Sequence, residues 1–151
     1  MGAAAKTAYR FESFYLDGAV EPATGESFFL ELPRLNTDTF QIFVDELAKT
    51  FTASCNILLL DNGAFHKAKA LALADNLITL FLPPYSPELN PIERLWRDLK
   101  DQLAGNLPPT LDELFEQVAQ IITRYSTNDL RSLTAFSYLI EAITSANVYQ
   151  S

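Results

Sequence analysis

The sequence predicts an α/β domain in which a mixed β-sheet carries helices on its faces, followed by a C-terminal group of helices. Three observations lead to this fold class. The chain begins with an aromatic-rich segment, a turn and a second strand-like segment. Two short apolar runs follow, and each lies beside a helical segment. The chain ends with three helical segments. This order is typical of α/β domains. A chain of 151 residues is long enough to bury the core of one domain.

The first part of the chain predicts a hairpin and a helix. Residues 9–20 are rich in aromatics and predict a strand, and residues 27–32 predict a second one. The five residues 21–25 between them contain Pro and Gly, which favour a turn. A helix capped by Thr37 or Asp38 is expected to run to about Phe51, with one apolar face.

The second part alternates apolar runs with helical patterns. The continuous apolar run at residues 56–60 predicts a strand that is buried on both faces. The further elements expected are a helix at 65–74, a strand at 77–82, a proline-rich loop at 83–90, and helices at 91–103, 111–125 and 129–144.

Composition and charge narrow the class of protein. The single cysteine, Cys55, cannot form an internal disulfide, and its place beside an apolar run predicts a buried, inert thiol. No apolar run reaches the 18 residues of a membrane span, so a cytoplasmic protein is expected. The net charge of −8 argues against a simple DNA-binding module. Residues 1–60 and 101–151 each carry −4, whereas residues 61–100 are neutral, so the middle is the least repulsive to a polyanion.

Asp61 is the first residue of a motif whose side chains could take part in metal binding or catalysis. An acid directly after a buried strand is held on a rigid element and suits a hard cation such as Mg²⁺ or Mn²⁺. From the local sequence alone, a helix cap or an Asx-turn is the favoured explanation of Asp61. His66, the only histidine, could contact phosphate or support Asp61, or could be an ordinary polar residue of a helix. Lys67 and Lys69 could meet DNA phosphates or form a solvated face.

Glu93 belongs to a second motif at the start of a helix. Asn90 is expected to cap this helix and Pro91 to be its first residue, which places Glu93 at the third position. A capping box with Asn90, or an ion pair with Arg97, are structural alternatives for Glu93. Trp96 falls on the apolar stripe of the helix and is therefore expected in the core.

Together the two motifs resemble a known family. Residues 61–66, DNGAFH, followed by residues 82–96, LPPYSPELNPIERLW, resemble the DDE transposases of bacterial insertion sequences, in the group related to mariner elements. Residues 18–29, GAVEPATGESFF, are similar to a hairpin of that family. The resemblance covers about residues 9–104 and implies a ribonuclease H-like fold, with residues 105–151 as a C-terminal helical segment of the same single unit, 1–151.

The resemblance also implies chemistry and partners. Family members hold two divalent ions, Mg²⁺ or Mn²⁺, on three acids and use them to cut and join DNA at transposon ends. Asp61 corresponds to the second acid and Glu93 to the third, with thirty-one residues between them. DNA contact or support of the site is expected from six further residues: Asn62, His66, Lys67, Tyr85, Asn90 and Arg94.

The first acid of the family has no counterpart here. The family carries it on a strand before the hairpin, and Met1 to Arg10 contain no acid. We therefore expect a fold whose first strand is missing, an exposed sheet edge that favours self-association, weakened metal binding, and a chain that is inactive alone. It would be a remnant of an element or the downstream frame of a split enzyme. Alternatives are a different ribonuclease H-like nuclease that uses Asp17, and a non-catalytic protein that binds itself or a full-length transposase.

Overall fold

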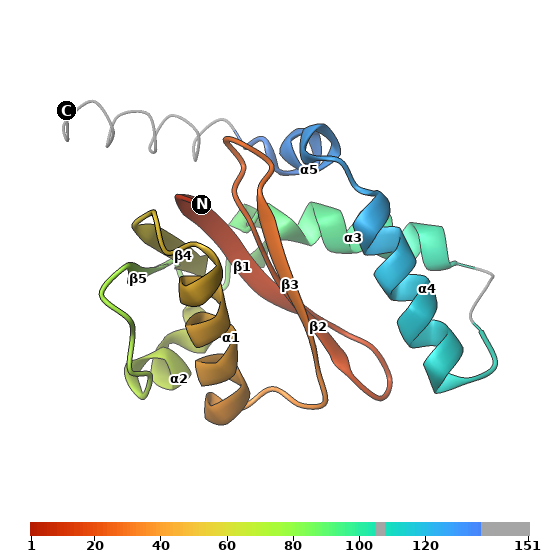
Figure 1. Ribbon diagram of the computed structural model, residues 1–151, viewed down its shortest axis with the longest axis horizontal. Coiled ribbons are helices and arrows are strands. Elements are labelled where there is room, and N and C mark those ends of the chain that lie inside the picture. Colours follow the sequence, from red (N-terminus) through yellow and green to blue (C-terminus); the bar gives the residue numbers. More distant parts are fainter. Residues whose placement is uncertain (105–107, 137–151) are drawn as a thin grey trace.

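A computed structural model describes residues 1–104 and 108–136 (Figure 1). Its strands and helices follow one another in this order: β1 Ala3–Arg10, β2 Tyr15–Val20, β3 Ser27–Leu32, α1 Thr37–Thr50, β4 Asn56–Leu60, a 3-10 turn η1 Asn62–Ala64, α2 Phe65–Lys69, β5 Leu77–Phe81, a 3-10 turn η2 Pro87–Leu89, α3 Ile92–Leu103, α4 Leu111–Arg124 and α5 Thr127–Thr134.

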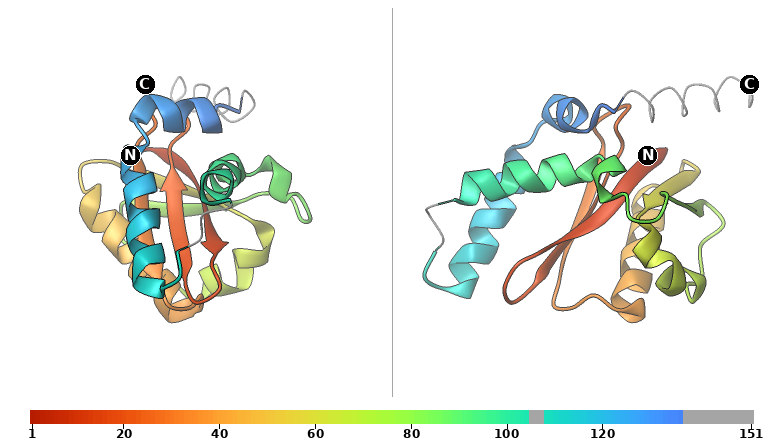
Figure 2. Two further views of the ribbon diagram at one scale, coloured as in Figure 1. Left: turned by 90° about the vertical axis from the view of Figure 1, so that its right-hand side faces the viewer. Right: turned by 180° about the vertical axis from the view of Figure 1, so that it is seen from behind.

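The five strands form one mixed sheet in the order β3-β2-β1-β4-β5. Strand β1 runs antiparallel to β2, with Thr7 opposite Gly18, and parallel to β4, with Ala5 opposite Leu59. Strands β4 and β5 are parallel. With helices on both faces, this is the ribonuclease H-like arrangement, as the sequence predicted (Figures 1 and 2).

The expectation of a missing first strand is wrong for this sheet. Residues Ala3–Arg10 fill the central position between β2 and β4, so the sheet has no gap there. The small side chains of Ala4 and Ala5 are almost fully buried, which lets the strand lie between the two helical layers. Neighbours on both sides satisfy its backbone hydrogen bonds, and this outweighs the weak strand preference of alanine.

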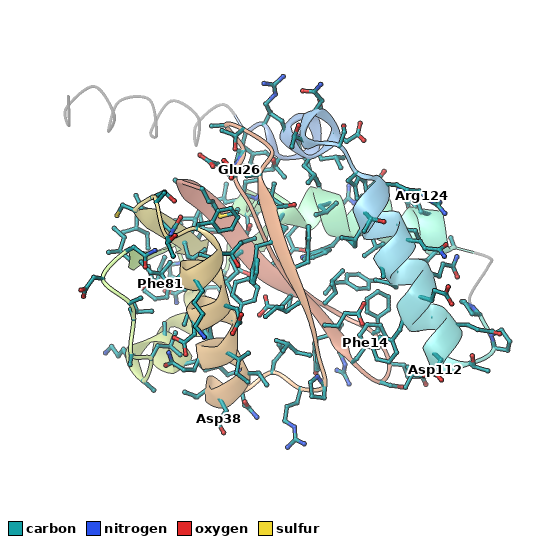
Figure 3. The ribbon with its side chains drawn as sticks, in the orientation of Figure 1. Phe14, Glu26, Asp38, Phe81, Asp112 and Arg124 are labelled. Atoms are coloured by element: carbon teal, nitrogen blue, oxygen red, sulfur yellow. The ribbon has the colours of Figure 1, made fainter. Side chains whose placement is uncertain are left out.

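Residues 9–20 are not one strand, contrary to the prediction. The chain folds back between β1 and β2, where the Phe11 N–H donates to the Phe14 carbonyl at 2.8 Å. The Phe11 and Phe14 rings stack with centroids 4.6 Å apart, and the ring centroids of Phe14 and Phe115 of α4 are 4.1 Å apart. Figure 3 labels Phe14 at this end of the sheet. The turn therefore places both rings in one aromatic cluster. In a continuous strand, the two rings would point to opposite faces of the sheet.

The predicted hairpin is confirmed. Strands β2 and β3 pair antiparallel from Val20 and Ser27 outwards. The Glu21 N–H donates to the Glu26 carbonyl at 2.9 Å across the turn, and Gly25 has a φ of 79°, which glycine adopts without strain.

The helix boundaries differ from the prediction in several places. Helix α1 is capped by Asn36, not by Thr37 or Asp38, because Asn36 and Thr39 form a reciprocal capping box. Helix α2 ends at Lys69 rather than near residue 74. Helix α3 matches its expected range to within a residue, and α4 agrees too. The predicted helix 129–144 is wrong at both ends that can be compared: α5 begins at Thr127 and already ends at Thr134. The part of the prediction from residue 137 on lies outside the described residues.

Two apolar cores lie on opposite faces of the sheet. Helix α1 covers one face, where Phe43, Val44 and Leu47 are buried, whereas α3, α4 and α5 cover the other (Figure 2). Trp96 is buried in the second core, as predicted. None of the helices described in residues 1–104 and 108–136 is long and apolar enough to cross a membrane. The prediction for Cys55 is wrong: it precedes β4 and is exposed, because only the apolar run after it enters the sheet.

Candidate active site

Asp61 stands at the carboxyl end of β4, the end at which α/β sheets collect their binding sites. Two neighbouring backbones fix this end: the Leu82 N–H donates to the Leu60 carbonyl at 2.8 Å, and the Ala64 N–H donates to the Asp61 carbonyl at 3.0 Å. Helix α2 starts after Ala64 without a side-chain cap. The half-buried Asp61 carboxylate is therefore not used as the cap of α2, and it remains available to a ligand.

Asn90 connects Asp61 to the start of α3. Its side chain is completely buried, and its amide nitrogen donates to Asp61 Oδ1 at 3.3 Å and to the Lys6 carbonyl at 3.2 Å. Its amide oxygen accepts the Ile92 N–H at 3.3 Å. Helix α3 begins at Ile92 with Pro91 as its N-cap, so Asn90 lies one residue before the capping position that the sequence predicted for it. One side chain thus joins β1, the end of β4 and α3. The bond to Asp61 crosses 29 positions and carries no local signal.

Glu93 lies in the first turn of α3 and close to Asp61. Glu93 is exposed at the surface, but desolvation by the surrounding protein atoms, and then the negative charge of Asp61, raise the pKa of the Glu93 carboxyl above its ordinary value. Among the residues described, no ion pair joins Glu93 to Arg97. The structural alternative that used Arg97 is therefore not realised. Two carboxyl groups close enough to repel each other create a site of negative charge at the end of β4.

A cavity of about 280 Å³ opens beside Asp61. Its wall includes the buried ion pair of Lys6 and Asp17, with Nζ and Oδ1 2.8 Å apart. The ammonium group also lies 4.5 Å from the ring centroids of Phe40 and Phe43. Asp17, the early acid that a different nuclease would need, is thus already paired with Lys6.

Strand β1 brings no acid to this site. Ala5 pairs with Leu59, so two residues further along both strands Thr7 comes level with Asp61, and both residues line the cavity. Within residues 1–104 and 108–136, no group of three His, Cys, Asp or Glu side chains is placed to hold a metal ion. Asp61 and Glu93 offer the hard oxygen donors that Mg²⁺ and Mn²⁺ prefer, but as a pair rather than a trio.

The other expected residues surround Asp61 and Glu93 to different degrees. Lys67 is exposed and lines the cavity, and Asn62 is exposed in η1. Arg94 is exposed on α3, with its guanidinium carbon 4.2 Å from the ring centroid of Phe136. Tyr85 is fully exposed in the loop before α3. The side chain of His66 lies outside the described part of the structure, although its backbone belongs to α2.

Two relatives and one solved structure are similar to this chain. It is 33% identical over 110 residues to the uncharacterized protein y4pE/y4sA of Sinorhizobium fredii (strain NBRC 101917 / NGR234), which covers 72% of this chain and 77% of that protein. It is 30% identical over 100 residues to the insertion element IS630 uncharacterized 39 kDa protein of Shigella sonnei, which covers 63% of this chain but 29% of that protein. The catalytic core domain of BIV integrase aligns over 97% of both chains, with a TM-score of 0.48 and 19% identity.

The family match extends across the site and the sheet. The sequence fits the family described as DDE superfamily endonuclease over residues 3–115, which include β1, Asp61, Asn90 and Glu93. That range is well over half of the chain. The chain therefore belongs to the DDE superfamily endonucleases.

Proposed function

We propose that the chain is the catalytic-domain portion of a transposase, which cuts and joins DNA at transposon ends. The observation that carries this proposal is the Asp61–Asn90 hydrogen bond, which holds the carboxylate after β4 beside the start of α3 and Glu93. Family membership supports the same reaction class. In this role the chain would work in the bacterial cytoplasm, at the nucleoid when bound to DNA.

Asp61 and Glu93 would hold a divalent cation, Mg²⁺ or Mn²⁺. A bound cation would offset the desolvation and the negative charge of Asp61, which together raise the pKa of Glu93. Its chemistry would be to activate water or a DNA 3′-hydroxyl and to neutralise charge on the leaving oxygen. Asn90 would orient Asp61, while Lys67 at the cavity and Arg94 on α3 would contact phosphates of the DNA backbone.

We further propose that the chain is inactive on its own. Support comes from β1, which has Thr7 rather than an acid level with Asp61, so one carboxylate of a three-acid site is lacking. The test is strand cleavage of supercoiled DNA by the purified protein with Mn²⁺. We expect no cleavage. Efficient cleavage that disappears in Asp61→Ala would refute this proposal.

A Thr7→Asp variant tests the reason for inactivity. An added carboxylate level with Asp61 should tighten Mn²⁺ binding, measured from the free-ion electron paramagnetic resonance signal. Thr7→Asn provides the matched control, because it has the same shape without the charge. Equal Mn²⁺ affinity in the two variants would show that position 7 does not face the metal site.

A second candidate is a non-catalytic interaction role. Edge strand β5 leaves Ile78 and Leu80 47% and 52% exposed on one face of the sheet. Exposed apolar side chains on an edge favour association with another chain. Light scattering, and co-purification with a full-length transposase, distinguish this role. The interaction role is contradicted if the wild type is a monomer that does not co-purify with the full-length transposase, and if Leu80→Ser gives the same result in both measurements.

A further inference from the structure

Tyr85 combines a strained backbone conformation with a side chain that is almost fully exposed. Its φ is 59°, the left-handed region, and no other non-glycine residue in the described part of the chain has a positive φ. Its side chain is 99% exposed, so the ring gains no burial in exchange for the backbone strain. Strain of this kind persists only where the surrounding structure imposes it, and it concentrates at functional sites.

The loop that carries Tyr85 is anchored at both ends beside Asp61. At one end, the Leu82 N–H donates to the carbonyl of Leu60, the residue before Asp61. At the other end, the buried Asn90 donates to Asp61 itself. Between these anchors, the Ser86 hydroxyl donates to the Pro84 carbonyl at 3.2 Å and the Leu89 N–H donates to the Ser86 carbonyl at 3.1 Å. The loop therefore presents Tyr85 from a fixed base.

The length of the loop limits how far Tyr85 is from the site. It is the third residue after Leu82, so its backbone lies at most about 11 Å from that anchor. Successive nucleotides of one DNA strand rise by about 3.4 Å. A strand whose phosphate lies at Asp61 and Glu93 would thus bring bases about one to three nucleotides away within reach of the ring.

Charge alone gives the chain little attraction for DNA. Its net charge is −8, and residues 61–100, which contain the site, are neutral overall. A contact that does not depend on charge then contributes a larger share of DNA binding. Stacking on an aromatic ring is such a contact, and it works with any base because every base has a π-face.

We propose that Tyr85 is a stacking platform for an unpaired nucleobase next to the phosphate held at Asp61 and Glu93. This inference rests on the proposed function, since it takes DNA as the ligand. The ring, not the hydroxyl, makes the contact. The side chain is 99% exposed, so a base that has left the duplex can stack on the ring.

The experiment compares three variants in binding to a labelled duplex with a three-nucleotide single-stranded end and to the blunt duplex. Tyr85→Asn removes the ring, and asparagine tolerates a positive φ, so thermal unfolding should occur at or above the wild-type temperature. We expect it to lose about 5- to 100-fold in affinity for the single-stranded end, at low and high salt alike. Tyr85→Phe should bind within about twofold of wild type, because the ring remains.

Lys67→Ala is the matched control. Losing a phosphate contact weakens DNA binding mainly at low salt, and it reduces the dependence of the affinity on salt concentration. Tyr85→Asn binding the single-stranded end like wild type would overturn the inference. Equal losses in Tyr85→Phe and Tyr85→Asn would overturn it too, in favour of the hydroxyl. A Tyr85→Asn variant that keeps DNA binding but changes self-association would identify a protein contact instead. If the wild type binds neither the duplex with the single-stranded end nor the blunt duplex, the proposed function fails together with this inference. The other outcomes leave the proposed function intact.

Discussion

Replacing Asn90 by aspartate places a charge at the junction of β1, β4 and α3. Asn90→Asp keeps the shape of the side chain and the oxygen that accepts the Ile92 N–H. It converts the amide nitrogen, which donates to Asp61 at 3.3 Å, into a second carboxylate oxygen. A favourable hydrogen bond therefore becomes a repulsion between two acids, one of them in a completely buried position.

The magnitude follows from the distance. Two unit charges 3.3 Å apart repel by about 5 kcal/mol at an effective dielectric constant of about 20. Because Asp61 is partly exposed, and because the new carboxyl can take up a proton, we expect a net loss of about 2–3 kcal/mol in the free energy of unfolding at pH 7. For a chain of this size that is about 4–12 °C in Tm.

The loss depends on pH with a definite sign. Repulsion and burial raise the pKa of the introduced carboxyl in the folded state above its unfolded value of about 3.9. Below that unfolded value the group is protonated in both states, so the penalty is small. As pH rises, the unfolded state releases its proton first, and the variant loses stability progressively towards pH 7.

The assay is thermal unfolding followed by circular dichroism at pH 4.5 and pH 7.5. Asn62→Asp is the matched control, because it adds the same charge beside Asp61 on an exposed residue. We expect the gap between Asn90→Asp and this control to widen from pH 4.5 to pH 7.5. If Asn90→Asp unfolds within a degree of the control at both pH values, the buried link between Asn90 and Asp61 does not exist.

Three further variants test other contacts. Lys6→Met leaves Asp17 buried without its partner and should cost about 3–5 kcal/mol, whereas the double variant with Asp17→Leu should recover most of this loss in urea unfolding; equal losses would contradict a buried pair. Gly18→Ala puts a Cβ 2.7 Å from the Phe29 ring, so we expect about 1–3 kcal/mol of destabilisation, and a neutral result in the same assay would rule out this crowding. Glu93→Gln removes a carboxylate whose charge is disfavoured by desolvation and then by Asp61, so its Tm should exceed that of wild type at pH 7 but not at pH 4; the same difference at both pH values would exclude a raised pKa.

The sequence predicted the elements whose signals are local. The hairpin turn with Gly25, the apolar run of β4 and the amphipathic α3 all have strong short-range patterns. Asp61 and Glu93 stay a prediction as catalytic acids, made because both lie in long motifs; the structure adds that the charge of Asp61 acts on Glu93.

The elements that the sequence did not predict depend on distant contacts. Strand β1 is rich in alanine, which has little preference for strands, and it forms because β2 and β4 pair with it on both sides. The turn at Phe11 and Phe14 depends on aromatic contacts with α4. The hydrogen bond between Asn90 and Asp61 joins residues that no pattern of local spacing relates.

The exposed position of Cys55 makes β4 useful as a spectroscopic ruler. It is the only cysteine in the sequence and lies just before β4, whereas Asp61 lies just after it. Asp61 is the sixth residue after Cys55, and at about 3.3 Å per residue of strand the two positions lie about 20 Å apart. A nitroxide or a fluorophore attached to this thiol would thus be within dipolar range of Mn²⁺ at Asp61, or within energy-transfer range of a dye on a DNA end. Labelling needs no cysteine to be added or removed, and the label stays away from the residues that would bind the substrate.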